Sequence, residues 1–174
     1  IGTCEVTLLD LANAYACLAR EGVYSPVRST EAGAAGPDQR IFCPETAFMI
    51  ADMLSGDERQ FDVAGHVADA AMPRIAWKTG TSSGRRDILA AAWNPDYVVA
   101  VWLGNPDGAP TKDARGNDAA IAALNIFREL YPSGCGPWYE RPVGLAARMV
   151  CAASGAPACP YCPEKALDDY VPGV

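Results

Sequence analysis

Three short apolar runs between positions 75 and 103 constrain the fold of this 174-residue chain more than any other feature. Each is rich in strand-forming residues and bounded by turn residues. The runs cover 75–82, 88–93 and 97–103. The last two are joined by Asn94-Pro95-Asp96, in which proline fixes φ and the Asn and Asp side chains can bond nearby backbone. The pattern predicts an antiparallel meander of three strands.

Three amphipathic segments predict helices beside this sheet, because apolar residues recur in them at the spacing of a helix face. They cover 7–22, 44–54 and 117–131. In the first, the Thr7 hydroxyl can cap the N-terminus of the helix, and Gly22 can end the helix. The predicted fold class is therefore α+β, a layered α/β arrangement with an antiparallel sheet meander flanked by helices. Trp93 and Trp102 are expected in its core.

The charge balance argues against a nucleic-acid partner. The chain has 14 Lys and Arg residues against 21 Asp and Glu residues, and its formal net charge is −7. Binding to phosphate backbones needs a basic patch, and the longest basic run is Arg85-Arg86. No apolar stretch approaches the ~18 residues of a membrane span, and the first residues do not form a basic leader. We expect any export signal or anchor to lie upstream.

The composition changes after position 131. Residues 132–174 hold half of the 14 prolines and four of the seven cysteines. We interpret them as an exit segment or linker, distinct from residues 1–131. There Cys151, Cys159 and Cys162 could form a disulfide, stay free or bind zinc, in that order of preference. Zinc ranks last because the only histidine, His66, lies far away in a predicted loop over 56–73. No metal and no cofactor are expected.

The most informative motif ends the first predicted strand. There the sequence reads Trp77-Lys78-Thr79-Gly80-Thr81-Ser82. Taken alone, it fits an exposed strand lysine beside β-forming threonines. It also resembles the Lys-Thr-Gly strand of serine acyltransferases that bind penicillin, which borders their active site. In those enzymes the glycine leaves a gap that admits the substrate backbone, and the hydroxyl groups receive the substrate carboxylate.

The resemblance extends over about residues 3–131, to the transpeptidase domain of class A, bifunctional penicillin-binding proteins. Its segments follow in the family's order; they are Glu5–Gly22, Phe42–Leu54, Ala76–Ser82, Asp87 and Asn94–Gly104. Trp77 before the lysine favours the 1C subgroup, and Val150–Gly155 resembles the exit of that domain. The resemblance implies a penicillin-binding transpeptidase or serine β-lactamase-like fold, only partly present, with residues 1–131 as the C-terminal half of the domain.

The resemblance also implies a role for each residue of the motif strand. Lys78 would be a cation near the nucleophile, and the backbone N–H of Thr81 would be one of two donors to the reaction's oxyanion. These two residues are the catalytic candidates. Asp87 would support the adjacent turn, through nearby amides or by pairing with Arg85 or Arg86. The predicted substrate-binding residues are Thr79, Gly80, Thr81 and Ser82.

The family's nucleophile is missing from this chain, because neither a Ser-x-x-Lys nor a Ser-x-Asn motif is present. None of the lysines follows a serine at that spacing; they are Lys78, Lys112 and Lys165. The sequence therefore predicts part of a peptidoglycan D,D-transpeptidase that works through an acyl-serine, with its serine outside this chain and no activity of the chain alone. Two alternatives stay open: a noncatalytic peptide- or partner-binding module, and a serine β-lactamase-like hydrolase.

Partners and location are implied by the same resemblance. The partners are peptidoglycan stem peptides, β-lactams and the upstream half of the same domain. A sheet without its neighbouring strands would also expose an edge that could pair with another copy. In the family, the enzyme is periplasmic, is anchored to the inner membrane upstream, and carries a glycosyltransferase module there. In such an oxidising compartment, Cys151 is predicted to pair with Cys159 or Cys162.

Overall fold

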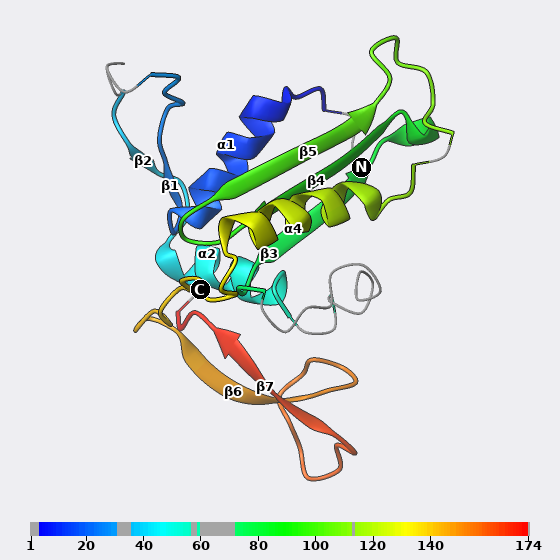
Figure 1. Cartoon of the computed structure of the whole chain (residues 1–174). Helices are drawn as coiled ribbons and strands as arrows, with labels where there is room; N and C mark the ends of the chain where they lie inside the picture. Colours follow the sequence, from blue (N-terminus) through cyan, green and yellow to red (C-terminus); the bar gives the residue numbers. More distant parts are fainter. Residues whose placement is uncertain (1–3, 31–35, 57–58, 60–71, 113, 174) are drawn as a thin grey trace.

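A three-stranded antiparallel sheet forms the centre of the chain (Figure 1). The computed structural model describes residues 4–30, 36–56, 59, 72–112 and 114–173. The strands are β3 (Ala76–Thr81), β4 (Asp87–Trp93) and β5 (Val98–Gly104), in the order β3-β4-β5. In their register, Ala91 of β4 lies between Lys78 of β3 and Ala100 of β5. The predicted meander is confirmed.

Helices cover both faces of this sheet. Helix α4 (Asp118–Leu130) packs on one face, and α1 (Leu8–Ala19) and α2 (Pro44–Met53) lie toward the other. Small residues let α4 approach closely, because Ala119, Ala120 and Ala123 are fully buried against the sheet. The predicted α+β class, an antiparallel sheet flanked by helices, is confirmed.

Two residues set the ends of α1. Thr7 Oγ1 accepts a hydrogen bond from the backbone N–H of Asp10 at 3.1 Å, which satisfies a free donor of the first turn. Gly22 follows the helix with φ of 89°, where an L side chain is strained. A Cβ there would lie 2.2 Å from the carbonyl oxygen of Phe42, so glycine also lets Phe42 lie close to the end of α1. Strand β1 (Val23–Tyr24) follows Gly22 directly. The partner of β1 is the short strand β2 (Gln39–Arg40).

The turn between β4 and β5 is built around a buried amide. Asn94 is 0% exposed, and its Oδ1 accepts hydrogen bonds from the backbone N–H groups of Asp96 and Tyr97, at 3.1 and 2.9 Å. Its Nδ2 donates to Tyr131 Oη at 2.9 Å, and that hydroxyl donates to Asp96 Oδ2 at 2.7 Å. The predicted bonding of the Asn side chain to nearby backbone is confirmed, and it also fastens the turn to the end of α4.

Residues 132–174 contain a separate two-stranded sheet. Strands β6 (Ala146–Cys151) and β7 (Lys165–Tyr170) pair antiparallel and extend away from the layered part (Figure 1). Arg148 Nη2 forms an ion pair with Asp168 Oδ2 across the strands, at 2.9 Å. The sequence did not predict these strands because exposed and buried residues do not alternate along them, so they lack the apolar alternation of a half-buried strand. A domain boundary after residue 131 stays a prediction.

Two further expectations concern parts of the chain outside this architecture. None of the described helices combines the length and the apolar character that a membrane span requires. His66 and most of the predicted loop over 56–73 lie outside the described residues. The predicted position of His66 in a loop therefore stays a prediction.

Candidate active site

The outer edge of β3 is covered at its beginning and open at its end. Trp77 N–H donates to the carbonyl oxygen of Leu54 at 3.0 Å, and Arg59 Nη2 donates to the Trp77 carbonyl oxygen at 2.9 Å. Backbone groups of alternate strand residues point to the same edge. The N–H and C=O groups of Thr79 and Thr81 therefore also point outward. Within the described residues, no strand pairs with β3 on that side.

The side chains of β3 are divided between the two faces of the sheet. Ala76 lies in the cluster toward α1 and α2, and Trp77 lies in the cluster below α4. Since side chains alternate along a strand, Lys78 shares the face of Ala76, while Thr79 and Thr81 share the face of Trp77. A ligand along this edge would meet the ammonium from one face and the hydroxyl groups from the other.

Lys78 supplies the positive charge at this edge. The side chain is exposed, and Nζ donates to the carbonyl oxygen of Thr79. None of the ion pairs found among the described residues includes Lys78. Because an ammonium carries three donors, it can bind an anion without losing an internal ion pair.

Gly80 leaves open space in front of the strand. A Cβ at this position would have no described atom within 4 Å beyond its chain neighbours, so packing inside the chain does not require glycine here. On the opposite face, a Cβ at Gly116 would lie 3.7 Å from Thr81 Oγ1, which places the loop before α4 beside the end of the strand. The missing side chain at Gly80 thus gives room to a molecule that docks on β3.

A hydrogen-bonded network closes the turn between β3 and β4. Ser82 Oγ donates to Asp87 Oδ2 at 2.8 Å and accepts from the Asp87 N–H at 2.9 Å. Trp102 Nε1 donates to Asp87 Oδ1 at 2.9 Å. The hydrogen bond from Trp102 and then that from Ser82 hold the pKa of Asp87 below its ordinary value. Asp87 therefore fastens the turn to β5, and the Ser82 hydroxyl is already engaged.

Asp87→Asn should remove part of the pH dependence of stability. A carboxyl group whose pKa is lowered by folding contributes stability above its unfolded pKa of ~3.9, and this contribution is lost as the pH falls through the lower folded value. Urea unfolding should show that the free energy of unfolding falls less between about pH 7 and about pH 3 for Asp87→Asn than for the parent. Trp102→Phe should also make this fall in the free energy of unfolding smaller, because it removes the indole N–H that donates to Asp87. An unchanged pH dependence in both variants would contradict the assignment.

Trp102 is not a core residue, so that expectation is wrong. Its side chain is 39% exposed, whereas Trp93 is 0% exposed and its ring centroid lies 5.1 Å from that of Tyr15. Trp102 lies on the face opposite α4, near the end of β5, since its neighbours Val101 and Leu103 pack toward α4. Apolar periodicity identifies a strand, but it does not reveal that a ring at the strand's end binds a carboxylate.

The loop before α4 is fastened to the same turn. Thr111 donates from its N–H and from Oγ1 to the carbonyl oxygen of Arg85, both at 2.8 Å. Arg85 Nη2 donates to the Ala114 carbonyl oxygen at 2.7 Å, and Arg85 itself has φ of 55°. The sequence had assigned Arg85 only as a candidate partner of Asp87. These contacts join segments far apart in sequence, so no local motif predicts them.

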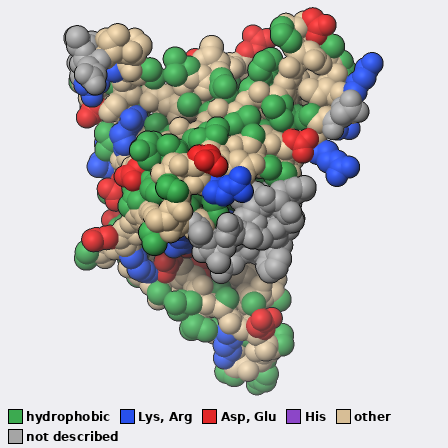
Figure 2. All heavy atoms as spheres, viewed as in Figure 1, with side chains coloured by type: hydrophobic (Ala, Val, Ile, Leu, Met, Phe, Trp, Pro, Cys, Tyr) green, Lys and Arg blue, Asp and Glu red, His purple; other side chains and the backbone are tan. Residues whose placement is uncertain are grey.

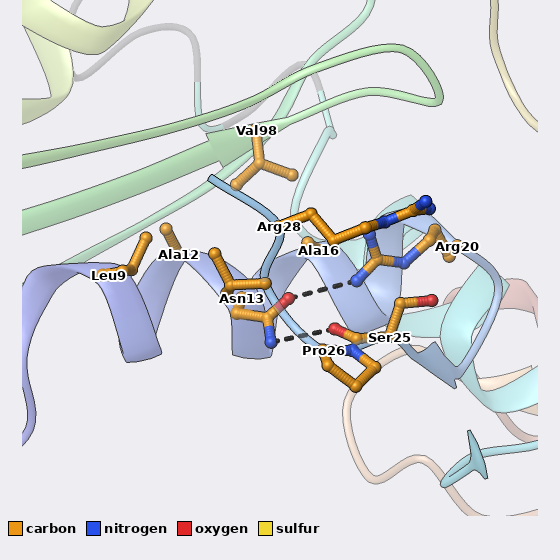
Figure 3. Close-up of a pocket in the computed structure, with 10 residues that line it drawn as sticks. Leu9, Ala12, Asn13, Ala16, Arg20, Ser25, Pro26, Arg28 and Val98 are labelled. Atoms are coloured by element: carbon orange, nitrogen blue, oxygen red, sulfur yellow. Dashed lines mark hydrogen bonds between the residues drawn. The ribbon is translucent and has the colours of Figure 1, made fainter. Parts of the chain in front are cut away.

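A groove lies between α1 and the chain that follows β1 (Figure 3). This open groove has a volume of about 420 Å³ and includes Leu9 and Val98 in its lining. Its polar groups bond with each other: Asn13 Nδ2 donates to the Ser25 carbonyl oxygen and Arg20 Nη2 donates to Asn13 Oδ1, both at 3.1 Å. These contacts fasten the chain after β1 to α1, so the polar part of the groove has a structural role.

Three cysteines gather at the end of β6 and in the loop that follows it. Cys159 Sγ and Cys162 Sγ lie 3.5 Å apart, and the neighbouring Cys162 thiol contributes to lowering the pKa of Cys151. All three are free thiols in this structure, and the predicted pairing of Cys151 with either of the others stays a prediction. Across the described residues, no group of His, Cys, Asp and Glu side chains is arranged to hold a metal ion.

Comparisons by sequence and by structure both find penicillin-binding proteins. Penicillin-binding protein 1C of Escherichia coli is 32% identical over 164 residues, which cover 89% of this chain and 20% of the relative. Penicillin-binding protein 1A of Clostridium tetani is 29% identical over 133 residues, covering 74% and 17%. The crystal structure of penicillin-binding protein 1A from Haemophilus influenzae superimposes with a TM-score of 0.76 over 97% of this chain and 32% of that one. No protein-family model matches.

The chain spans about a fifth of the length of these two curated relatives. At 14% identity, the likeness to the solved structure shows the fold alone. Sequence and fold nevertheless agree, and the order of helices and strands fits one part of a larger domain. The chain belongs to the class A penicillin-binding proteins and corresponds to part of their transpeptidase domain.

Proposed function

We propose that this chain forms one wall of the active site of a serine-type D,D-transpeptidase, which cross-links peptidoglycan stem peptides and is acylated by penicillin. The observation that carries the proposal is the open outer edge of β3, which contains Lys78, Gly80 and Thr81; among the described residues, β4 is the one strand that pairs with β3. The relatives are named penicillin-binding proteins, which supports this reading. The nucleophilic serine is supplied by a part of the protein outside this chain.

The open edge suits an extended peptide. A strand edge offers main-chain donors and acceptors to an added strand, and alternate side chains provide selectivity. The outward N–H and C=O groups of Thr79 and Thr81 would bind the peptide backbone, with the Thr79 carbonyl oxygen shared with Lys78. Gly80 would let that backbone approach closely, because no side chain occupies the space before it. The Thr79, Thr81 and Ser82 hydroxyl groups are the proposed carboxylate ligands, although Ser82 first has to release Asp87.

The reaction proceeds in two acyl transfers. The serine oxygen attacks the carbonyl carbon of a D-Ala-D-Ala peptide bond, an acyl-serine ester forms, and D-Ala leaves as an amine. An amine of a second stem peptide then attacks the ester and restores the serine. The Thr81 N–H would donate to the oxyanion in both steps, and such a donor contributes about 3 kcal/mol where one has been removed. The Lys78 ammonium would favour the deprotonated serine and the anionic end of the peptide.

The remaining faces suggest where the rest of the protein packs. The outer edge of β5 pairs with no strand in the described part. Tyr97, just before β5, is 46% exposed, and Trp102 in β5 is 39% exposed. Hydrophobic side chains also gather on the face that α4 and β5 present in Figure 2. We propose the upstream half of the domain as the main partner of this chain, with pairing between two copies as the consequence when that half is missing. The periplasm, with an anchor to the inner membrane upstream, is the proposed location.

A labelling experiment tests the missing nucleophile. The chain alone should form no covalent adduct with a fluorescent penicillin, because a cation and hydrogen-bond donors cannot replace the serine. Mixing it with the upstream half that contains Ser-x-x-Lys should restore labelling, with the label on that half. A stable adduct on this chain, located by mass spectrometry, would contradict the proposal. Rapid hydrolysis of the adduct would favour a β-lactamase-like hydrolase, and no labelling of the complete protein would favour a noncatalytic binding module.

A further inference from the structure

Three thiols form a cluster beside the β6–β7 hairpin, separate from the open end of β3. Cys162 adjoins both other thiols. Its Sγ lies 3.5 Å from Cys159 Sγ. The Ala152 N–H donates to the Glu164 carbonyl oxygen at 3.1 Å, which brings Cys151 beside the segment that contains Cys162, and the pKa of each of these two thiols is affected by the other. A disulfide needs an S–S distance of about 2.05 Å, so Cys159 and Cys162 need only a small approach to form a bond. The cluster therefore contains two candidate pairs, and both include Cys162.

The backbone of the loop between β6 and β7 holds this cluster together. The loop folds back along β6, where the N–H of Cys151 donates to the carbonyl oxygen of Ala156 at 2.8 Å. A tight turn follows, in which the Cys162 N–H donates to the Cys159 carbonyl oxygen at 3.2 Å. The Cys159 N–H in turn donates to Cys162 Sγ at 3.3 Å. These hydrogen bonds fix the Cys159–Cys162 turn and fasten the loop to Cys151 without any disulfide.

The three thiols differ in exposure. Cys159 is exposed, Cys162 is half-buried and Cys151 is only 8% exposed. An external oxidant can therefore reach Cys159 first, whereas Cys151 can be reached from Cys162. Exposure thus decreases from Cys159 through Cys162 to Cys151.

Hydrogen bonds also shift the pKa values of the three thiols in different directions. A hydrogen bond from the Ser154 side chain, with backbone N–H groups, lowers the pKa of Cys151 to about 7. The hydrogen bond from Cys162 lowers the pKa of Cys159. For Cys162 itself a backbone hydrogen bond with Cys159 lowers the pKa, but its thiol partners and burial together raise it. Cys162 thus holds its proton between two thiols that lose theirs more readily, and thiolates are the attacking species in disulfide exchange.

We propose that Cys159, Cys162 and Cys151 form a thiol–disulfide exchange site, in which Cys159 reacts with an external small-molecule or protein disulfide and Cys162 transfers the bond to Cys151. First, the Cys159 thiolate attacks one sulfur of the external disulfide, whose S–S bond breaks and releases one thiolate. Cys162 then gives up its proton to that thiolate and attacks the Cys159 sulfur, which expels the second external thiolate. Finally, the Cys151 thiolate attacks the Cys162 sulfur and releases Cys159. Two protein thiols are oxidised, and the external disulfide is reduced to two thiols.

The exchange leaves a distinctive product. The bond moves inward, from the exposed Cys159–Cys162 pair to the Cys151–Cys162 pair at the end of β6. Cys159 becomes a free, exposed thiol again and can meet a further disulfide or thiol. A single static pairing would predict one disulfide only, whereas a shared Cys162 predicts a mixed disulfide on Cys159 followed by two successive internal bonds.

Oxidised glutathione is the probe for this site, and it is added to the 174-residue chain. Replacing Cys4, Cys43 and Cys135 with serine gives a background that lacks the other exposed thiols, while Cys17 is 4% exposed. Acid quenching, alkylation and peptide mapping by mass spectrometry should show glutathione on Cys159 first, and then an internal disulfide at Cys162. The parent chain mapped in the same way keeps the experiment interpretable if the serine background folds poorly.

Three single variants assign the steps. Cys162→Ser should keep glutathione on Cys159 and form no internal disulfide within the same time. Cys151→Ser should stop at the Cys159–Cys162 bond, and Cys159→Ser should slow the reaction with glutathione at least about tenfold, because the remaining thiols are less accessible. Far-ultraviolet circular dichroism checks that each variant is folded.

Each alternative outcome would overturn the proposal. An internal bond between Cys151 and Cys159 in Cys162→Ser, formed as fast as the bond in the background chain, would remove the shared role of Cys162. An undiminished rate in Cys159→Ser would remove its role as the entry thiol. Thiols that react only after a chelator has withdrawn a bound zinc ion would show that the cluster is a metal site.

Discussion

Lys78→Ala in the complete protein is expected to slow acylation by penicillin about 100- to 1,000-fold while the fold is kept. The side chain is exposed, and its recorded contact is the hydrogen bond from Nζ to the Thr79 carbonyl oxygen. The substitution therefore removes a charge at the open edge and almost no packing. Stopped-flow fluorescence with a labelled penicillin gives the acylation rate constant, and circular dichroism confirms the fold.

Two variants separate this effect from a general loss of charge or of binding. Lys165→Ala removes an exposed strand lysine of the β6–β7 sheet and should leave acylation within about twofold of the parent. Thr81→Val keeps the backbone N–H but loses the hydroxyl, so it should raise the concentration needed for half-maximal acylation more than it lowers the maximal rate. If Lys78→Ala acylates at the parent rate, the catalytic assignment of β3 is wrong.

Phe127→Ala is expected to lower the free energy of unfolding by about 3–5 kcal/mol. The Phe127 ring is 0% exposed, packs in the cluster between α4 and the sheet, and lies parallel to the Tyr131 ring at 6.4 Å between centroids. Its removal leaves a cavity and loosens Tyr131, which hydrogen-bonds with buried Asn94 in the β4–β5 turn. Urea denaturation followed by tryptophan fluorescence measures the change.

The neighbouring residue on the same helix gives the matched control. Ile126 is 44% exposed, so Ile126→Ala removes little buried area and places a better helix former on the surface. We expect its free energy of unfolding to change by less than about 0.5 kcal/mol. Equal effects of the two variants would mean that α4 is not packed against the sheet as described.

The central fold was predictable because its signals are local. Each strand of the β3-β4-β5 sheet carries its own apolar run, and the Asn94 turn and the Thr7 cap use atoms within three residues of each other. The meander needs no long-range pairing, since its strands are consecutive in sequence. Such elements follow from propensity, periodicity and turn chemistry.

The β6–β7 hairpin could not be predicted in this way. Exposed and buried residues do not alternate along its strands, so no periodic apolar pattern separates them from an extended tail. They are held by backbone pairing and by ion pairs such as Arg148 with Asp168, twenty residues apart. The connecting loop then folds back on β6, and this brings together thiols whose spacing had left disulfide, free thiols and zinc as open alternatives.

For the candidate site, the sequence by itself determined which groups are present: a lysine, a glycine and threonines in consecutive positions on a strand, with no Ser-x-x-Lys beside them. Only the tertiary structure decided how they are displayed. Leu54 and Arg59 cover the beginning of the β3 edge, and Trp102 and Thr111 fix the turn at its end, so that no described strand covers the stretch from Lys78 to Thr81. Local chemistry specifies a strand, but exposure of its edge depends on contacts from residues distant in the chain.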